Sequence, residues 1–269
     1  PPGPPDFAIA GPTGVTITAG TPTTTTINVT SVNRFTGTVH LAVSSSSPTL
    51  TASISPANIT SAGVATLRLS STNNGSYTVT ITGTSGSLKH TVVPRVATPI
   101  YASLATSNGT FLVELFPAQA PQTVANFVKL ANSGFYTNLT WHRIVPAFVI
   151  QTGDPTTLNG GGDRSTWGQH GSAQTVPLEI DSSLRNDYGY LGMARSSDVN
   201  SGSSQFYINI NPKNNNNLNG NYTVFGKVLG NGMDIVNKIA SVPIYNQQNS
   251  PYYDQPVTAV LLNSVTILP

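Results

Sequence analysis

An arginine inside an apolar stretch is the first candidate for chemistry in this sequence. The stretch runs Trp141-His-Arg-Ile-Val-Pro-Ala-Phe-Val-Ile-Gln-Thr-Gly-Asp154 and also carries Phe148 and Gln151. An arginine is rarely buried without a partner, so Arg143 needs a reason to be there. A guanidinium is a fixed set of N–H donors that can stabilise a developing partial charge, and a nearby aromatic ring would supply an apolar surface.

Spacing alone does not bring these three side chains together. In a plain alternating strand Phe148 falls on the face opposite Arg143, so a shared site needs a bend or bulge, for which Pro146 is the candidate. From the pattern alone, a surface arginine and a core phenylalanine are favoured.

Other catalytic constellations are missing from the sequence. There is no cysteine, which excludes thiolate sites and disulfides. The histidines lack the spacing of metal ligands and stand at His40, His90, His142 and His170. The segment Asp198-Val-Asn-Ser-Gly202 hints at a calcium loop, but Asn209 stands where such a loop needs its last carboxylate, so a polar turn is favoured. We therefore predict no metal and no cofactor.

Further blocks after the arginine stretch make the sequence resemble a known family. They are Gly189-Tyr-Leu-Gly-Met-Ala194, Ser203-Ser-Gln-Phe-Tyr-Ile-Asn209 and Leu218-Asn-Gly-Asn-Tyr-Thr-Val-Phe-Gly-Lys-Val228, preceded by Asn126-Phe-Val128 and Gly134-Phe-Tyr136. Together with the arginine stretch they resemble the cyclophilin-type peptidyl-prolyl cis–trans isomerases across residues 100–269. Met193-Ala-Arg195 and the C-terminal ending are most similar to the periplasmic bacterial branch of that family.

The resemblance implies a role for each matching residue. Arg143 would be the catalytic guanidinium, with Phe148 and Gln151 beside it. The implied substrate-binding residues are Val149, Ala194, Arg195, Gln205, Tyr207, Leu218 and Tyr222. Among all of these, the proline ring would lie against Phe148, Tyr207 and Leu218, and the substrate backbone against Gln151 and Gln205. The residue before proline would meet Ala194 and Arg195, and Tyr222 would close the rim.

The implied reaction breaks no bond. Resonance in the amide gives a rotation barrier of about 18–20 kcal/mol, and uncatalysed X-Pro exchange takes roughly tens to hundreds of seconds. Catalysis requires that the twisted amide be bound better than either planar form. The nitrogen of a twisted amide is more basic, so a guanidinium donor can favour it, and neither a nucleophile nor a metal is needed.

Some positions depart from the family pattern. Asn217 stands where the family usually has Trp, or Phe in the periplasmic branch, Val149 stands where Met is common, and Tyr207 where Phe is commoner. The first change predicts weaker cyclosporin binding, and the other two predict a pocket of different size and polarity. Because the guanidinium is retained, we expect activity, which the altered pocket could lower.

Two helices and several strands are predicted to position these residues. Residues 121–132 predict a helix with Pro121 at its start, Val124 and Phe127 on an apolar stripe and Gly134 as a stop. Residues 233–240 predict a second, short helix. Strands are predicted at residues 111–116, 141–151, 189–194, 205–210, 223–228 and 259–267. This arrangement favours a closed antiparallel β-barrel capped by the two helices.

The N-terminal third of the sequence has a different residue pattern. Between residues 6 and 96, apolar residues alternate with Thr or Ser in short runs separated by turn clusters, which predicts an antiparallel β-sandwich. Asp6-Phe-Ala-Ile9, Phe35-Thr-Gly-Thr-Val39 and Gly75-Ser-Tyr-Thr-Val-Thr-Ile81 resemble the Ig-like modules of prokaryotic surface proteins, and we interpret the segment as a spacer or stalk. Residues 1–5 form a proline-rich arm and residues 97–99 a linker. The fold class is therefore mainly β.

Composition indicates where such a protein would work. Only 8% of residues are charged, against about 25% in typical soluble proteins. Surfaces rich in Thr, Ser, Asn and Gly suit a secreted, periplasmic or cell-surface protein, so we expect an extracytoplasmic location. A net charge of +2 without a Lys/Arg run excludes nucleic acid as a partner. No stretch approaches the roughly 20 apolar residues of a membrane span.

Two hypotheses of different classes follow from the sequence. In the first, the protein is an extracytoplasmic isomerase acting on X-Pro bonds of proline-containing polypeptides. In the second, it is a structural or adhesive surface protein that reuses the cyclophilin fold. The second draws on the Asn-rich loop at residues 214–217 and on self-assembly by residues 1–10 as an added strand on a neighbour's sheet. A frayed end of the first strand is the favoured interpretation of the arm.

Overall fold

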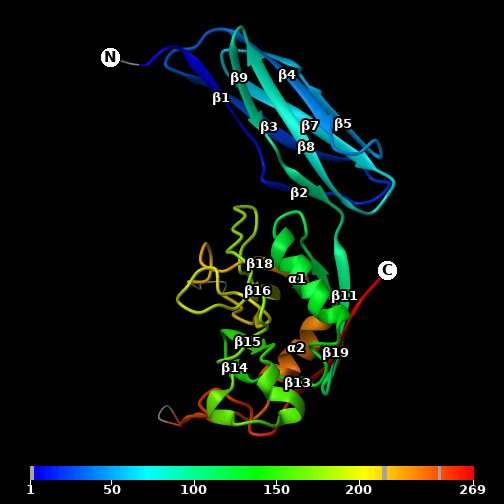
Figure 1. Cartoon of the computed structure of the whole chain (residues 1–269), viewed down its shortest axis with the longest axis vertical. Helices are drawn as coiled ribbons and strands as arrows, with labels where there is room; N and C mark the ends of the chain where they lie inside the picture. The colour runs from blue at the N-terminus through cyan, green and yellow to red at the C-terminus, as the bar shows by residue number, and fades with distance from the viewer. Residues whose placement is uncertain (1–2, 214–216, 248–249) are drawn as a thin grey trace. The chain divides into compact units, whose positions relative to one another are not determined.

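The computed structural model describes residues 3–213, 217–247 and 250–269 of the chain. Two compact units are present, Pro1–Pro99 and Ile100–Pro269 (Figure 1). Residues 1–2 of the predicted arm and 214–216 of the Asn-rich loop lie outside the described residues. Within the described part of the chain, none of the helices has both the length and the apolar character that crossing a membrane requires.

The N-terminal unit consists of two sheets. A four-stranded antiparallel sheet has the order β1 (Asp6–Ala10), β3 (Thr23–Val32), β7 (Gly63–Ser71), β5 (Leu50–Ser55). The second sheet has the order β2 (Gly14–Thr16), β10 (Arg95–Ala97), β8 (Ser76–Ser85), β4 (Thr38–Ser45), β6 (Asn58–Thr60), with β9 (Leu88–Val92) paired to β8. Ala97 of the predicted linker therefore belongs to a strand.

Alternation in the sequence explains why these strands form. In β7, Ala65, Leu67 and Leu69 are fully buried while the residues between them face outward. Apolar residues from both sheets share one hydrophobic core. The unit is therefore β throughout, with one apolar and one wet face per strand. Asp6–Ala10 pairs along its length with β3, so the strand predicted for donation to a neighbour already lies in its own sheet.

The C-terminal unit is built on one nine-stranded sheet. Its order is β13 (Leu139–Thr140), β19 (Leu261–Ile267), β11 (Ile100–Thr106), β12 (Gly109–Leu115), β18 (Val224–Val228), β16 (Tyr190–Met193), β17 (Phe206–Asn209), β15 (Val149–Thr152), β14 (Arg143–Val145). The first and last strands of this order are separated in the chain by Trp141 and His142 alone. The sheet must therefore curl until its two edges approach each other.

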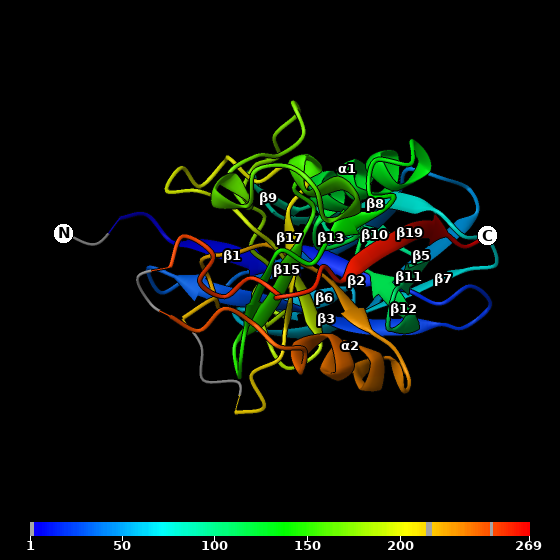
Figure 2. The same cartoon turned by 90° about the horizontal axis from the view of Figure 1, so that it is seen from below.

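Two helices complete the core of this unit. Helix α1 (Pro121–Asn132) has the predicted bounds, and α2 (Gly232–Ala240) begins one residue before its predicted start. Figure 2 shows the two helices on opposite sides of the curled sheet. Phe127 of α1 packs edge-on against Phe206 of β17, with ring centroids 5.5 Å apart. Side chains from both helices and from the strands are buried together in one apolar cluster. This burial holds in place the strands that carry the site.

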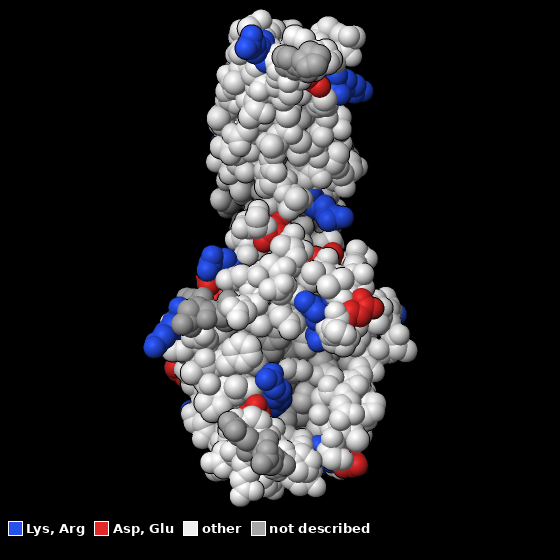
Figure 3. Space-filling view, turned by 90° about the vertical axis from the view of Figure 1, so that its left-hand side faces the viewer, with Lys and Arg blue, Asp and Glu red and all other residues white. Residues whose placement is uncertain are grey.

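Charged side chains are sparse over the surface of the molecule. The face drawn in Figure 3 is mostly uncharged, with Lys, Arg, Asp and Glu scattered over it. This follows from a sequence with twelve Lys or Arg and ten Asp or Glu in 269 residues.

Candidate active site

A tight hairpin, not one strand, carries Arg143, Phe148 and Gln151. The prediction of a single strand over residues 141–151 is wrong, because a turn at residues 146–148 separates β14 from β15. Phe148 N donates to the Val145 carbonyl at 3.1 Å, which closes this turn. Folding back in this way places Arg143 directly opposite Gln151. Pro146 thus marks a reversal of the chain where the sequence suggested a bend.

The neighbouring strand completes the row of polar groups. Gln151 is paired with Tyr207 of β17, and Gln205 lies just before that strand. The Gln151 amide donates to Gln205 Oε1 at 2.8 Å, and Arg143 Nη1 donates to Gln151 Oε1 at 3.5 Å. We call Arg143, Gln151 and Gln205 the polar row. All three are half-buried.

An apolar pocket lies beside the polar row. Its buried walls are Val149, Tyr207 and Leu218, which form a cluster apart from the main core. Phe148, Ala194 and Tyr222 are partly buried and pack against these walls. We call these six residues the apolar pocket. Its surface of rings and branched chains is what a proline ring can be buried against.

Two neighbours fix the ring of Tyr207. Gly192 lies under the ring, and a Cβ there would come within 2.1 Å of it, so only glycine leaves room for a tyrosine. Tyr222 meets Tyr207 edge-on with centroids 5.9 Å apart. Burial, reinforced by Tyr222 and opposed by Arg195, raises the pKa of Tyr207 well above its usual value. The phenol is therefore neutral and acts as a hydrogen-bond donor.

Asn186 is a buried residue of the site that sequence reasoning missed. Tyr207 Oη donates to Asn186 Oδ1 at 2.5 Å, and Asn186 Nδ2 donates to the Leu218 carbonyl at 3.1 Å. The Asn186 carbonyl also accepts from Asn209 Nδ2. One asparagine thus supports two walls of the apolar pocket. It lies in a loop without periodicity, so no pattern could have pointed to it.

The residues predicted to hold the position before proline lie at the edge of the pocket. Ala194 N donates to the Gln205 carbonyl at 2.9 Å, which ties this segment to the polar row. The Arg195 guanidinium lies 4.7 Å from the centroid of the Tyr222 ring, and its Nε donates to the Asn221 carbonyl at 2.9 Å. A groove of about 390 Å³ passes between these residues, lined by both glutamines of the polar row, Ala194 and Arg195 among others.

Two further ionisable groups lie near Arg143. Burial lowers the pKa of His142 to about 4, with Asp154 opposing the shift, so the imidazole is neutral at pH 7. Burial raises the pKa of Asp254, and the Arg143 guanidinium opposes that shift. Neither residue was among the sequence predictions. The imidazole next to Arg143 in the chain thus carries no charge at pH 7.

The structure brings all ten predicted residues to one place. Arg143, Gln151 and Gln205 form the polar row, and Val149, Tyr207, Leu218, Phe148, Ala194 and Tyr222 form the apolar pocket with Arg195 at its edge. The segment Asp198–Gly202 instead forms a turn in which Asn200 N donates to Asp198 Oδ1 at 2.9 Å. Among the described residues, no group of three or more His, Cys, Asp or Glu is placed to hold a metal.

Comparison with known proteins identifies the family. The model of the family described as cyclophilin type peptidyl-prolyl cis-trans isomerase/CLD matches residues 101–266. The chain therefore belongs to the cyclophilin-type peptidyl-prolyl cis–trans isomerases.

Two relatives and one solved structure illustrate the similarity. The chain is 37% identical over 173 residues to peptidyl-prolyl cis-trans isomerase-like 2 of Cryptococcus neoformans. The aligned region covers 62% of this chain and 27% of that relative. It is 35% identical to peptidyl-prolyl cis-trans isomerase A of Dickeya dadantii, covering 64% of this chain and 86% of that one. A solved cyclophilin-type isomerase of Cryptosporidium parvum superposes with a TM-score of 0.52 at 29% identity, covering 64% and 98% of the two chains. The chain thus spans about a quarter of the length of some relatives.

Proposed function

We propose that this protein catalyses cis–trans isomerisation of X-Pro bonds in polypeptides. The observation that carries the proposal is the Arg143 guanidinium, hydrogen-bonded to Gln151 on the strand that also carries Val149 of the apolar pocket. Family membership supports the same activity. A solved structure of the Cryptosporidium parvum relative, obtained in the presence of the dipeptide Ala-Pro, is 30% identical to this chain.

The geometry suits a reaction in which only one bond rotates. The proline ring binds in the apolar pocket, while the substrate backbone on the other side of the amide lies along Gln151 and Gln205. Rotation requires that these two halves be held separately. As the amide twists, its nitrogen gains basicity, and the guanidinium of Arg143 donates to it. Because the twisted form alone gains this interaction, the barrier falls without a matching gain for either planar form.

We further propose that the protein works outside the cytoplasm, on exported or surface polypeptides. The charged fraction of 8% supports this location, as does the similarity of Met193-Ala-Arg195 to the periplasmic branch. The two-sheet N-terminal unit, with its Ig-like phrases, would serve as a spacer for the isomerase unit. Fractionation of the source cells with an antibody to the protein tests the location. Recovery with cytoplasmic markers alone would overturn it.

The activity is tested with a short peptide that contains one X-Pro bond. The wild-type chain is expected to shorten isomerisation from the uncatalysed tens to hundreds of seconds to well below that range. Arg143→Ala should lose at least about 100-fold in kcat/KM, as removal of a transition-state donor typically does. Arg68→Ala, which removes an exposed guanidinium from the N-terminal unit, is the control and should match wild type. A wild-type rate equal to the uncatalysed rate would end the proposal.

A further inference from the structure

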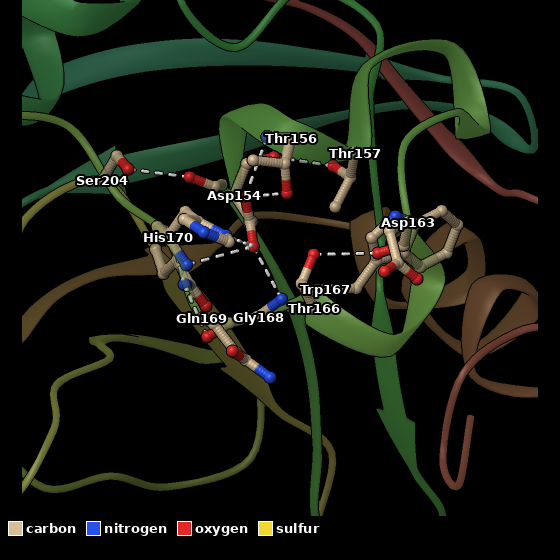
Figure 4. Close-up of polar contacts among 12 residues, drawn as sticks. Asp154, Thr156, Thr157, Asp163, Thr166, Trp167, Gly168, Gln169, His170 and Ser204 are labelled. Carbon is tan, nitrogen blue, oxygen red and sulfur yellow. Dashed lines mark hydrogen bonds and ion pairs between the residues drawn. The ribbon is translucent and has the colours of Figure 1, made fainter. Parts of the chain in front are cut away.

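A buried carboxylate behind the polar row takes no part in the functions described so far. The side chain of Asp154 is fully buried, two residues after the end of β15. Figure 4 shows hydrogen-bond donors converging on it. Oδ1 accepts from the backbone and hydroxyl of Thr156 at 2.8 and 2.7 Å, and Oδ2 accepts from Gly168 N and His170 N at 2.6 and 3.3 Å. Asp154 therefore fastens both ends of the loop over residues 155–170.

That loop presents two backbone carbonyls to the polar row. The carbonyls of Gly168 and His170 accept from Gln205 Nε2 at 2.9 and 2.6 Å. A carbonyl oxygen can only accept, so the NH₂ end of the Gln205 amide must face the loop. Its Oε1 is then left to face Gln151, whose NH₂ donates to it.

The orientation of the Gln151 amide is constrained in the same way. Because Gln151 uses its NH₂ on Gln205, its Oε1 must face Arg143, where Nη1 donates to it. Each amide has only two orientations, and the carbonyls of the loop select one for both. The direction of the chain of hydrogen bonds is therefore set at residues 168–170. Those residues are held in turn by Asp154.

We propose that Asp154 is a positioning residue of the isomerase site. By holding the carbonyls of Gly168 and His170 in place, it fixes the orientation of both glutamine amides and the direction of the Arg143 guanidinium. The proposal deepens the isomerase function and rests on it for its effect on rate. The amide orientations themselves do not depend on that function.

Separate contacts hold the outer part of the loop, which is residues 163–167. Arg164 Nη2 donates to the Pro256 carbonyl at 2.5 Å, and Gln255 Nε2 donates to the Arg164 carbonyl at 2.7 Å. The Arg164 guanidinium also lies 4.5 Å from the centroid of the Trp167 ring. Loss of the Asp154 carboxylate therefore shifts residues 168–170 without releasing the whole loop.

The loop also supplies a matched control. Asp154 caps the short 3-10 helix η1 (Pro155–Gly160), and Asp163 caps η2 (Arg164–Thr166) in the same manner. Asp163 Oδ1 accepts from the backbone and hydroxyl of Ser165 at 2.9 and 2.7 Å. These hydrogen bonds stay within the outer part of the loop. Asp163→Asn therefore perturbs a similar cap on the same loop without touching residues 168–170 directly.

The test compares Asp154→Asn with Asp163→Asn in the full chain. In Asp154→Asn the new NH₂ group must oppose either the two N–H donors of Gly168 and His170 or the backbone N–H of Thr156, so one end of the loop shifts. We expect kcat to fall between about 10-fold and 100-fold, with KM within about twofold, because a displacement near 1 Å can cost roughly 100-fold in rate. Asp163→Asn should keep both constants within about twofold. Equal effects of the two variants, or a change in KM alone, would overturn the proposal.

A measurement on the wild-type chain separates this proposal from the isomerase function. Both Gln205 Nε2 protons are bonded to loop carbonyls, so NMR should show their exchange with solvent slowed at least about tenfold relative to an exposed glutamine amide. That protection should be lost in Asp154→Asn and retained in Asp163→Asn. Unprotected Gln205 amide protons in the wild type would overturn the proposal even if Asp154→Asn fails to fold. Protected protons in an inactive wild-type chain would leave the positioning intact and remove the isomerase function.

Discussion

The apolar pocket and the polar row lie side by side but are held in place by different means. Val149, Tyr207 and Leu218 are each less than a tenth exposed, whereas the three residues of the polar row are half-buried. Burial orders an apolar wall because water is excluded from it. A half-buried amide or guanidinium is ordered by its hydrogen bonds, each of which contributes only about 1 kcal/mol net. The pocket should therefore govern binding and stability, and the polar row the rate.

Truncation of a pocket wall should give the largest effect on stability and binding. Tyr207→Ala removes a buried ring, and such changes cost roughly 3–5 kcal/mol in folding free energy. We expect the free energy of unfolding to fall by about 3 kcal/mol and KM for an X-Pro peptide to rise at least tenfold. Urea denaturation and steady-state kinetics measure the two. Leu112→Ala, which truncates a side chain that is 44% exposed, is the control. A KM within twofold of wild type would show that Tyr207 does not line the binding site.

Acid should destabilise the fold through the buried His142. Burial lowers the pKa of His142 from 6.5 to about 4. The unfolded chain binds a proton more readily than the folded chain between these values, so the free energy of unfolding should fall as pH drops from 6.5 to 4. The slope is at most about 1.4 kcal/mol per pH unit. The raised pKa of Asp254 acts in the opposite direction just above pH 3.8, and the lowered pKa values of Asp6 and Asp163 act at and below pH 3.8. These three carboxyl groups are the same in wild type and in a variant at residue 142, so the difference between the two proteins reports on the imidazole.

Urea denaturation across this pH range makes the measurement, with His142→Leu as the comparison. The variant has no imidazole to protonate, so its stability should vary less with pH than that of wild type. Identical slopes for the two proteins would contradict the assignment of a neutral buried His142.

A smaller effect should link Asn186 to the apolar pocket. Tyr207→Phe removes the donor to Asn186 Oδ1, and Asn186→Leu removes its acceptor. In a double-mutant cycle on unfolding free energy we expect a coupling of about 1 kcal/mol, typical of a buried hydrogen bond. Additive effects within about 0.3 kcal/mol would show that the two side chains do not support each other.

Much of the fold was predictable because its signals are local. Pro121, the apolar stripe and Gly134 gave the bounds of α1, and alternation gave most strands. The turn at residues 146–148 gave only Pro146 as a signal, which suggested a bend and not a reversal, because the residue with positive φ is Ala147 and not a glycine or asparagine.

The site was predictable only where a family motif names its residues. Arg143, Phe148 and Gln151 lie in one such motif, so resemblance placed them in one site although alternation argued against it. Asn186 and Asp154 were missed because their partners are far away in the sequence. Asp154 meets residues 168–170 only after the loop has closed, and Asn186 meets Tyr207 across a loop and a strand.

The most direct test of the division between pocket and polar row is made on the bound peptide. NMR exchange spectroscopy at saturating protein gives the cis–trans exchange rate on the protein, and titration gives Kd for the same X-Pro peptide. For Arg143→Ala, the account predicts an exchange rate at least about 100-fold below wild type with Kd changed by less than about fivefold. An unchanged exchange rate, or a loss found only in Kd, would contradict it.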